Sequence, residues 1–208
     1  MIVGDGELLA LMRAIAGEDA AASAGWLGDA PELATARLVS GATRADNERF
    51  FLAPIRLQLY SGDTALHVAA AAYDTGFARR LLTAGADVEA RNRRGACPLH
   101  AATTGSPGSG SWNPRRQEAM IRLLVDSGAD PNATAAGGVT PLHRAVRNRC
   151  ASAVRALLAA GADPRRTNDH GSTALDLSRL TTGRGGSGSP EARAEQAKIV
   201  RMLEPIGP

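Results

Sequence analysis

The chain has 208 residues, of which 44% are hydrophobic, 22% are charged and only 3% are aromatic, and its formal net charge is +3. The aliphatic content suffices for a folded core, which excludes wholesale disorder, and no apolar run is long enough to span a membrane. Residues 1–11 lack the basic start of a secretory signal, and Cys97 and Cys150 are too few for a disulfide framework and lack zinc-site spacing. These features predict a cytoplasmic chain with no metal and no other cofactor.

The basic residues are almost all arginines, with 23 Arg against the single Lys198. Residues 1–60 carry a net charge of −3, and residues 61–208 carry +6. A charge of +6 over 148 residues favours an anionic partner only mildly. Nucleic-acid-binding modules concentrate their positive charge more strongly, so the sequence does not predict nucleic-acid binding.

The first 61 residues are irregular. Their periodicity predicts a helix at 7–16, a second at 18–27, and further helical segments at 31–38 and 44–52. Five of the seven aromatic residues then fall between positions 50 and 77. Two interpretations are open: the rings pack this insert onto the following segment, or they line an aromatic pocket formed by Phe50, Phe51, Tyr60 and Tyr73.

From residue 62 onward the chain repeats itself. The repeated openings are GDTALH at 62–67, GACPLH at 95–100, GVTPLH at 138–143 and GSTALD at 171–176. A second signature follows in the first three units, as LLTAGAD at 81–87, LLVDSGAD at 123–130 and LLAAGAD at 157–163. Two motifs that recur together predict stacked copies of one small unit, because no single unit can bury its apolar face alone.

This pattern resembles the ankyrin repeat, and the chain is identified as an ankyrin-repeat protein of the bacterial type. The resemblance implies an all-α solenoid of helix–turn–helix units with short β-hairpin fingers. It implies units at 62–94, 95–137, 138–170 and 171–208, packed as one domain with a degenerate capping unit and insert at 1–61. Thr64 and Thr140 are expected to cap first helices, and Gly85, Gly128 and Gly161 to follow second helices in the left-handed conformation.

Three histidines occupy one position of the repeated opening. The resemblance implies that His67, His100 and His143 bond to the backbone of neighbouring turns, and their spacing along the solenoid is too wide to share a metal ion. Cys97 takes the capping position three residues before His100, so a catalytic Cys/His pair is the alternative to a structural role there. The sequence identifies no catalytic residue and leans against an enzyme.

Two units contain Gly/Ser-rich insertions between their helices, at 103–113 and 181–192. The segments 103–111 and 181–189 are identical at seven of nine positions. They are interpreted either as solvent loops or as loops whose amide and hydroxyl groups bind an anion or a small molecule. The candidate ligand residues are Thr104, Ser109, Trp112, Thr182, Arg184, Ser187 and Ser189.

The leading functional prediction is that the chain is a scaffold that binds another protein. In the ankyrin family, finger tips and the exposed side of each first helix contact partners, and arginines are frequent at the matching positions here. The candidate partner-binding residues are Arg91, Arg93, Arg94, Arg144, Arg147, Arg165, Arg166 and His170. Such a surface favours an acidic or polar partner, and a capped four-unit array is expected to be a monomer. The alternative is a small-molecule or anion-binding protein, with enzymatic activity left open, that uses the insertions and the aromatic N-terminal junction.

Overall fold

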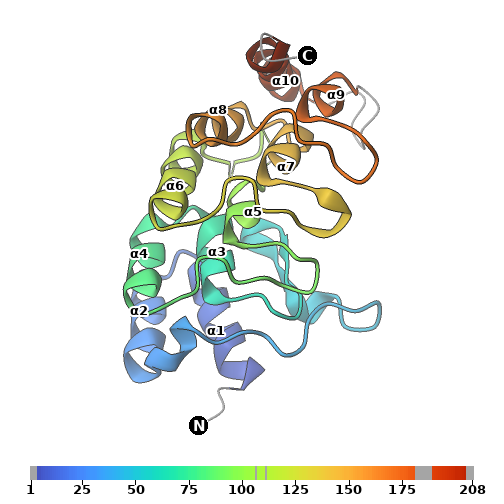
Figure 1. The fold of residues 1–208 in the computed structure, drawn as a ribbon. Helices are drawn as coiled ribbons and strands as arrows, with labels where there is room; N and C mark the ends of the chain where they lie inside the picture. The colour runs from blue at the N-terminus through green and yellow to red at the C-terminus, as the bar shows by residue number, and fades with distance from the viewer. Residues whose placement is uncertain (1–3, 106, 111, 181–188, 205–208) are drawn as a thin grey trace.

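The computed structural model describes residues 4–105, 107–110, 112–180 and 189–204. Within these residues the helices stack as antiparallel pairs, with fingers projecting from one side (Figure 1). The inner helices are α1 (Asp5–Ala16), α3 (Ala65–Ala72), α5 (Pro98–Ala102), α7 (Pro141–Arg147) and α9 (Ala174–Arg179). The outer helices are α2 (Ala20–Asp29), α4 (Thr75–Thr83), α6 (Pro114–Asp126), α8 (Ala151–Ala159) and α10 (Pro190–Leu203). The predicted all-α solenoid is confirmed.

Inner helices of the repeats begin at side chains that cap the free backbone N–H groups. The hydroxyl oxygens of Thr64, Thr140 and Thr173 accept hydrogen bonds from backbone amides three residues later. The residues after three outer helices are left-handed glycines with φ between 87° and 100°, namely Gly85, Gly128 and Gly161. The local rules read from the sequence therefore hold at both ends of the helices.

Buried histidines connect successive units. Each ring accepts a hydrogen bond at Nδ1 from the backbone amide of its own cap, and at Nε2 it lies against a backbone carbonyl of the next unit. His67 Nε2 is 3.0 Å from Ala96 O, and His100 Nε2 is 3.0 Å from Val139 O. His143 Nε2 lies 3.1 Å from Ser172 O. The carbonyl partner assigns the proton to Nε2, so neutral histidines join the stack as the sequence predicts.

The fingers are tight hairpins that also bond to one another. The Asn92 amide donates to Ala96 O and the Asn168 amide donates to Ser172 O, both at 3.0 Å. Between fingers, the Ala136 amide donates to Arg94 O at 2.8 Å. The third finger contains the short 3-10 turn η4 (Ala136–Gly138). These backbone hydrogen bonds hold the fingers at fixed positions beside the inner helices.

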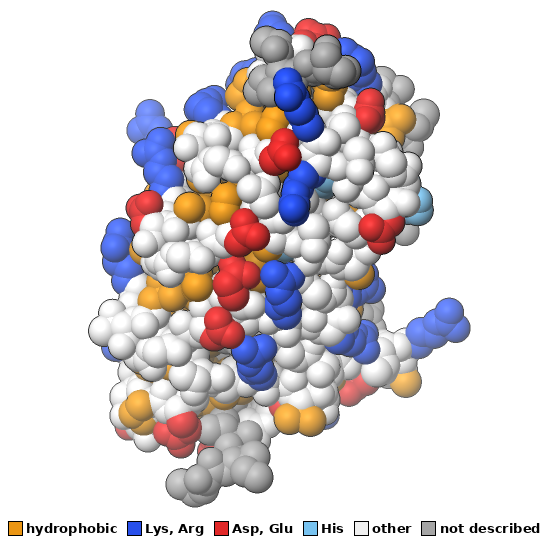
Figure 2. All heavy atoms as spheres, viewed as in Figure 1, with side chains coloured by type: hydrophobic (Ala, Val, Ile, Leu, Met, Phe, Trp, Pro, Cys, Tyr) orange, Lys and Arg blue, Asp and Glu red, His pale blue; other side chains and the backbone are white. Residues whose placement is uncertain are grey.

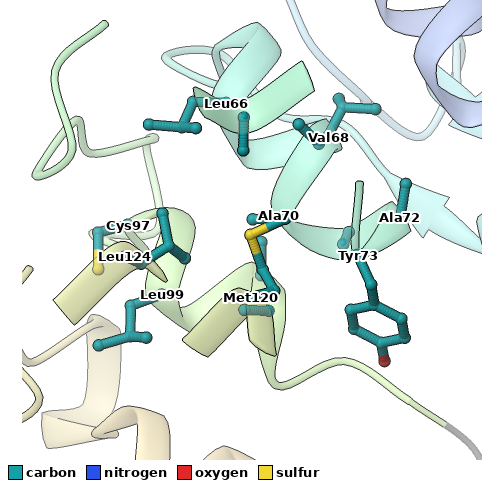
Figure 3. Packing of buried hydrophobic residues seen from close by; sticks show 14 of the residues in the cluster. Leu66, Val68, Ala70, Ala72, Tyr73, Cys97, Leu99, Met120 and Leu124 are labelled. Carbon is teal, nitrogen blue, oxygen red and sulfur yellow. The ribbon is translucent and has the colours of Figure 1, made fainter. Parts of the chain in front are cut away.

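The core is a continuous aliphatic layer between inner and outer helices. Figure 3 shows Leu66 and Ala70 of α3, Leu99 of α5, and Met120 and Leu124 of α6 gathered in it, and all five side chains are fully buried. Alanines on the inner helices let neighbouring helices approach closely at native packing density. The low aromatic content thus follows from the stacking. Among the described helices, none is long and apolar enough to cross a membrane.

The N-terminal region departs from the prediction after α2. Residues 44–52 are not a helix: a 3-10 turn η2 (Glu48–Phe50) leads into strand β1 (Phe51–Leu52), which pairs antiparallel with β2 (Leu57–Gln58) around η3 (Ala53–Ile55). The segment predicted at 31–38 is only a 3-10 turn, η1 (Pro31–Ala34). The Phe50 carbonyl accepts bonds from the Leu59 amide and the Gln58 side chain, so the hairpin takes the acceptor that a continuing helix needs.

Candidate partner-binding groove

A groove of about 630 Å³ runs along the inner-helix side of the stack. Its walls come from the N-terminal hairpin, the fingers, inner helices and α10. Of the residues that the structure describes, five arginines and one carboxylate, that of Asp63, line it; the arginines are Arg56, Arg94, Arg144, Arg147 and Arg149. The described wall of the groove is therefore strongly basic, whereas the whole chain carries a net charge of only +3.

Arg144 is the central cation of this groove. It lies on α7, it is partly buried, and its guanidinium makes no hydrogen bond or ion pair with any described residue. Burial, and then the charge of Arg147, lower the pKa of Arg144, while Asp63 raises it. Asp63 is already held by the Tyr60 amide at 2.7 Å and by the Asn92 side chain at 2.8 Å. The protein leaves Arg144 partly desolvated without neutralising it.

A second feature of the groove is a stack of arginines on Tyr60. The Arg94 guanidinium lies 4.4 Å from the ring centroid, and that of Arg93 lies 5.0 Å away. Arg93 also donates to the Ala42 carbonyl, whereas the Arg94 side chain makes no hydrogen bond with a described residue. The ring therefore fixes Arg94 while leaving its donors available to a partner.

Comparisons with known proteins agree with this architecture. A family model described as ankyrin repeats (3 copies) matches residues 37–134, and one described as ankyrin repeats (many copies) matches residues 123–178. The two matches together span well over half of the chain. The chain belongs to the ankyrin-repeat family.

A relative from Mus musculus, "Ankyrin repeat and SOCS box protein 16", is 39% identical over 115 residues. The match covers 55% of this chain but only 25% of the mouse protein. The mouse relative gives no support to the predicted bacterial type. Ankyrin repeats are protein–protein interaction modules, which makes the groove of this ankyrin chain the first candidate for a partner site.

The structure divides the predicted partner-binding residues into two sets. Arg94, Arg144 and Arg147 line the groove, as expected for the inner surface. Arg93 lies beside it, bound to the Ala42 carbonyl and stacked on Tyr60. The exposed Arg165 and His170 do not line the groove.

Arg91 and Arg166 form what we call the finger ladder, together with Arg37. Arg91 Nη1 donates to Thr134 O of the next unit at 2.6 Å, and Arg166 Nη1 donates to Asn132 O of the preceding unit at 2.8 Å. Arg37 pairs with Asp87 at 2.8 Å. On the face shown in Figure 2, acidic and basic side chains alternate in a column along the stack. The arginines of the finger ladder thus bind carbonyl and carboxylate groups of the same chain.

Two groove arginines, Arg56 and Arg149, were missed by sequence reasoning. Both are in the left-handed conformation, with φ of 51° and 58°. Arg56 follows η3 in the hairpin, and Arg149 lies in the turn between α7 and α8. The repeat pattern does not describe the hairpin, and the sequence offers no signal that either turn faces the groove.

The expectation of one aromatic pocket differs from the structure. Phe50 is 1% exposed in the core, whereas the next residue, Phe51, is 43% exposed on β1. Tyr60 lies in the groove, and Tyr73 is buried with its hydroxyl bonded to the Thr104 carbonyl. Phe50 ends the 3-10 turn η2 and Phe51 begins β1, so the two phenylalanines lie on either side of a change in backbone conformation. The rings therefore do not line one cavity.

The insertion residues fall into three groups. Thr104, Ser109 and Trp112 line a second cavity, away from the finger tips. Ser189 caps α10, with its hydroxyl accepting from the Ala192 amide at 3.3 Å. The other candidates, Thr182, Arg184 and Ser187, lie outside the described residues. Within the described part of the chain, no three metal-ligating side chains converge.

Proposed function

We propose that this chain binds an acidic segment of a partner protein in the inner groove. The observation that carries the proposal is Arg144, a partly buried cation with no hydrogen bond or ion pair to any described residue. A desolvated charge without a partner is costly, and a carboxylate from a ligand removes that cost while gaining charge-assisted hydrogen bonds. The native protein is therefore arranged to receive negative charge at this point.

The surroundings of Arg144 support an extended segment with several acidic side chains. Arg94 and Arg147 flank it, and Arg56 and Arg149 line the same groove. Among the described residues of the groove wall, the one carboxylate is that of Asp63, which raises the pKa of Arg144 and already accepts bonds from the Tyr60 amide and the Asn92 side chain. Arginine is common among residues that dominate binding energy, because its planar donors hold a carboxylate in two bonds.

The proposal is tested with a short peptide of alternating Glu and Ser and a matched peptide in which Gln replaces Glu. We expect calorimetry to detect binding of the acidic peptide alone, weakening with added salt. Arg144→Gln is expected to reduce affinity about 10- to 100-fold, because it removes charge-assisted bonds at a partly desolvated site.

The matched control is Arg165→Gln, which removes the same charge from an exposed position outside the groove. We expect it to change affinity less than about twofold, since exposed charges are screened. Equal binding of the two peptides, or equal losses from the two variants, overturns the proposal. The first outcome rejects an acidic ligand and the second rejects the groove.

A further inference from the structure

Several segments that depart from the plain repeat line a second cavity of about 700 Å³. It lies at the carboxyl ends of the inner helices, whereas the fingers join their amino ends. Its wall includes the α1–α2 turn with Glu18, the hairpin with Arg56, the α3–α4 turn with Tyr73, and the first Gly/Ser-rich insertion with Trp112. Its size falls within the range of small-molecule sites.

The turns around this cavity share one backbone arrangement. Glu18 and Tyr73 each follow an inner helix in the left-handed conformation with φ of 56°, and Arg149 does so with φ of 58°. The amides of the three residues donate to carbonyls three residues earlier, and the amides that follow donate to carbonyls five residues earlier. L-residues disfavour this conformation. In the second unit the insertion at 103–113 replaces the turn, so the chain departs from its own pattern beside the cavity.

The insertion is held by a buried polar network. The Gln117 side chain is fully buried, and its Nε2 donates to Tyr73 Oη at 3.1 Å and to Thr104 O at 3.3 Å. Its Oε1 accepts from Trp112 Nε1 at 3.0 Å. At Gly105 an added Cβ would lie 2.8 Å from Cys150 Sγ, so only glycine fits. Such fixed partners distinguish this loop from a passive linker and set the position of the indole.

The cavity wall has a defined chemistry. Among the described residues its charged side chains are Glu18, Arg116 and Arg56, of which Arg56 also lines the groove, and their sum is one positive charge in excess. Arg116 pairs with Glu18 at 2.7 Å, whereas the Arg56 guanidinium makes no hydrogen bond or ion pair with any described residue. Trp112 also lines the cavity, partly buried and packed against the hydrophobic core. We propose that this second cavity binds a small aromatic carboxylate, with its ring against Trp112 and its carboxylate on Arg56.

The test uses 2-naphthoate as the probe, with 2-naphthylmethanol as the uncharged analogue and acetate as the anion without a ring. In a Trp26→Phe background the fluorescence of Trp112 reports binding directly, because Trp26 and Trp112 are the two tryptophans. We expect saturable quenching by naphthoate, weaker binding of the alcohol and none of acetate. Arg56→Gln is expected to weaken naphthoate about tenfold and to leave the alcohol unchanged, since it removes one charge-assisted contact.

A steric variant tests the same cavity without altering charge. An added Cβ at Gly110 meets no heavy atom within 4 Å, so Gly110→Leu is expected to fold normally and to exclude naphthoate. Gly25→Leu is the matched control, because that position on α2 is equally open and lies outside the cavity. No saturable binding to the parent protein, or undiminished binding to both Arg56→Gln and Gly110→Leu, overturns the proposal. Circular dichroism melts confirm that each variant is folded.

Discussion

The arginines of the finger ladder and those of the groove have the same side chain and opposite surroundings. Arg91 and Arg166 donate to backbone carbonyls of neighbouring units and join the repeats together. Arg144 and Arg147 have no such acceptor among the described residues, and burial, followed by the charge of Arg147, lowers the pKa of Arg144. Position in the repeat therefore decides whether an arginine stabilises the scaffold or remains available for a partner.

The largest expected effect is the loss of stability of the protein in acid, where the groove arginines act on a buried histidine. Burial, and then the charges of Arg144 and Arg91, lower the pKa of His100 to about 4, although the bond to the Val139 carbonyl raises it. Unfolded histidine titrates near 6.5, so the unfolded state binds the additional proton between pH 6.5 and 4. The contribution of His100 is thus complete above pH 6.5 and is lost as pH falls to 4. We expect the free energy of unfolding, measured by urea titration, to fall by about 3 kcal/mol across this range from His100 alone.

Arg144→Met sharpens this prediction, because it removes one of the charges that hold His100 neutral. The variant is expected to lose less stability than the parent between pH 6.5 and 4. His170→Gln is the control, since His170 is exposed at a finger and its loss is expected to leave the profile unchanged. Constant stability of the parent from pH 7 to pH 4 contradicts the assignment of a buried neutral histidine.

The second prediction compares the two sets of arginines at neutral pH. Arg91→Met removes bonds to the Gly95 and Thr134 carbonyls, and we expect it to lower the free energy of unfolding by about 1 kcal/mol. Arg144→Met removes an unpaired, partly buried charge, and we expect it to raise that free energy by about 1 kcal/mol. Urea titrations of both variants measure the two changes. A loss of stability in both variants shows that Arg144 also supports the scaffold.

These contrasts explain what sequence reasoning could and could not reach. Helix caps such as Thr64, left-handed glycines such as Gly85 and the bridging role of His100 depend on local rules and on the repeat, so they were predicted correctly. The role of Arg91 depends on a carbonyl of Thr134, 43 residues away, and no local pattern reports that contact. The hairpin that brings Arg56 to the groove precedes the first repeated opening at residue 62, so the repeated motifs do not report its position.

The same distinction applies to the aromatic residues. Their concentration between positions 50 and 77 was visible in the sequence, but their directions depend on the β1–β2 pairing and on the network around Gln117. Phe50 lies in the core, and the ring of Tyr60 packs against the guanidinium of Arg94. The clustering of aromatic residues along the chain therefore predicted that this region departs from a plain repeat. It did not predict which rings are buried in the core and which line the groove.

The smallest expected effect concerns the outermost member of the ladder. Arg37 and Asp87 form an ion pair at 2.8 Å, with side chains 45% and 54% exposed. Exposed pairs contribute little because water and salt screen them, so a double-mutant cycle of Arg37→Gln and Asp87→Asn is expected to give a coupling of about 0.5 kcal/mol that vanishes at high salt. Asparagine retains the Oδ1 acceptor that receives the Glu89 amide, so the cycle isolates the charge. A coupling above about 1.5 kcal/mol, or one insensitive to salt, shows that even this exposed ladder member is structural. The ladder then differs from the groove along the whole stack, at Arg37 as well as at Arg91 and Arg166.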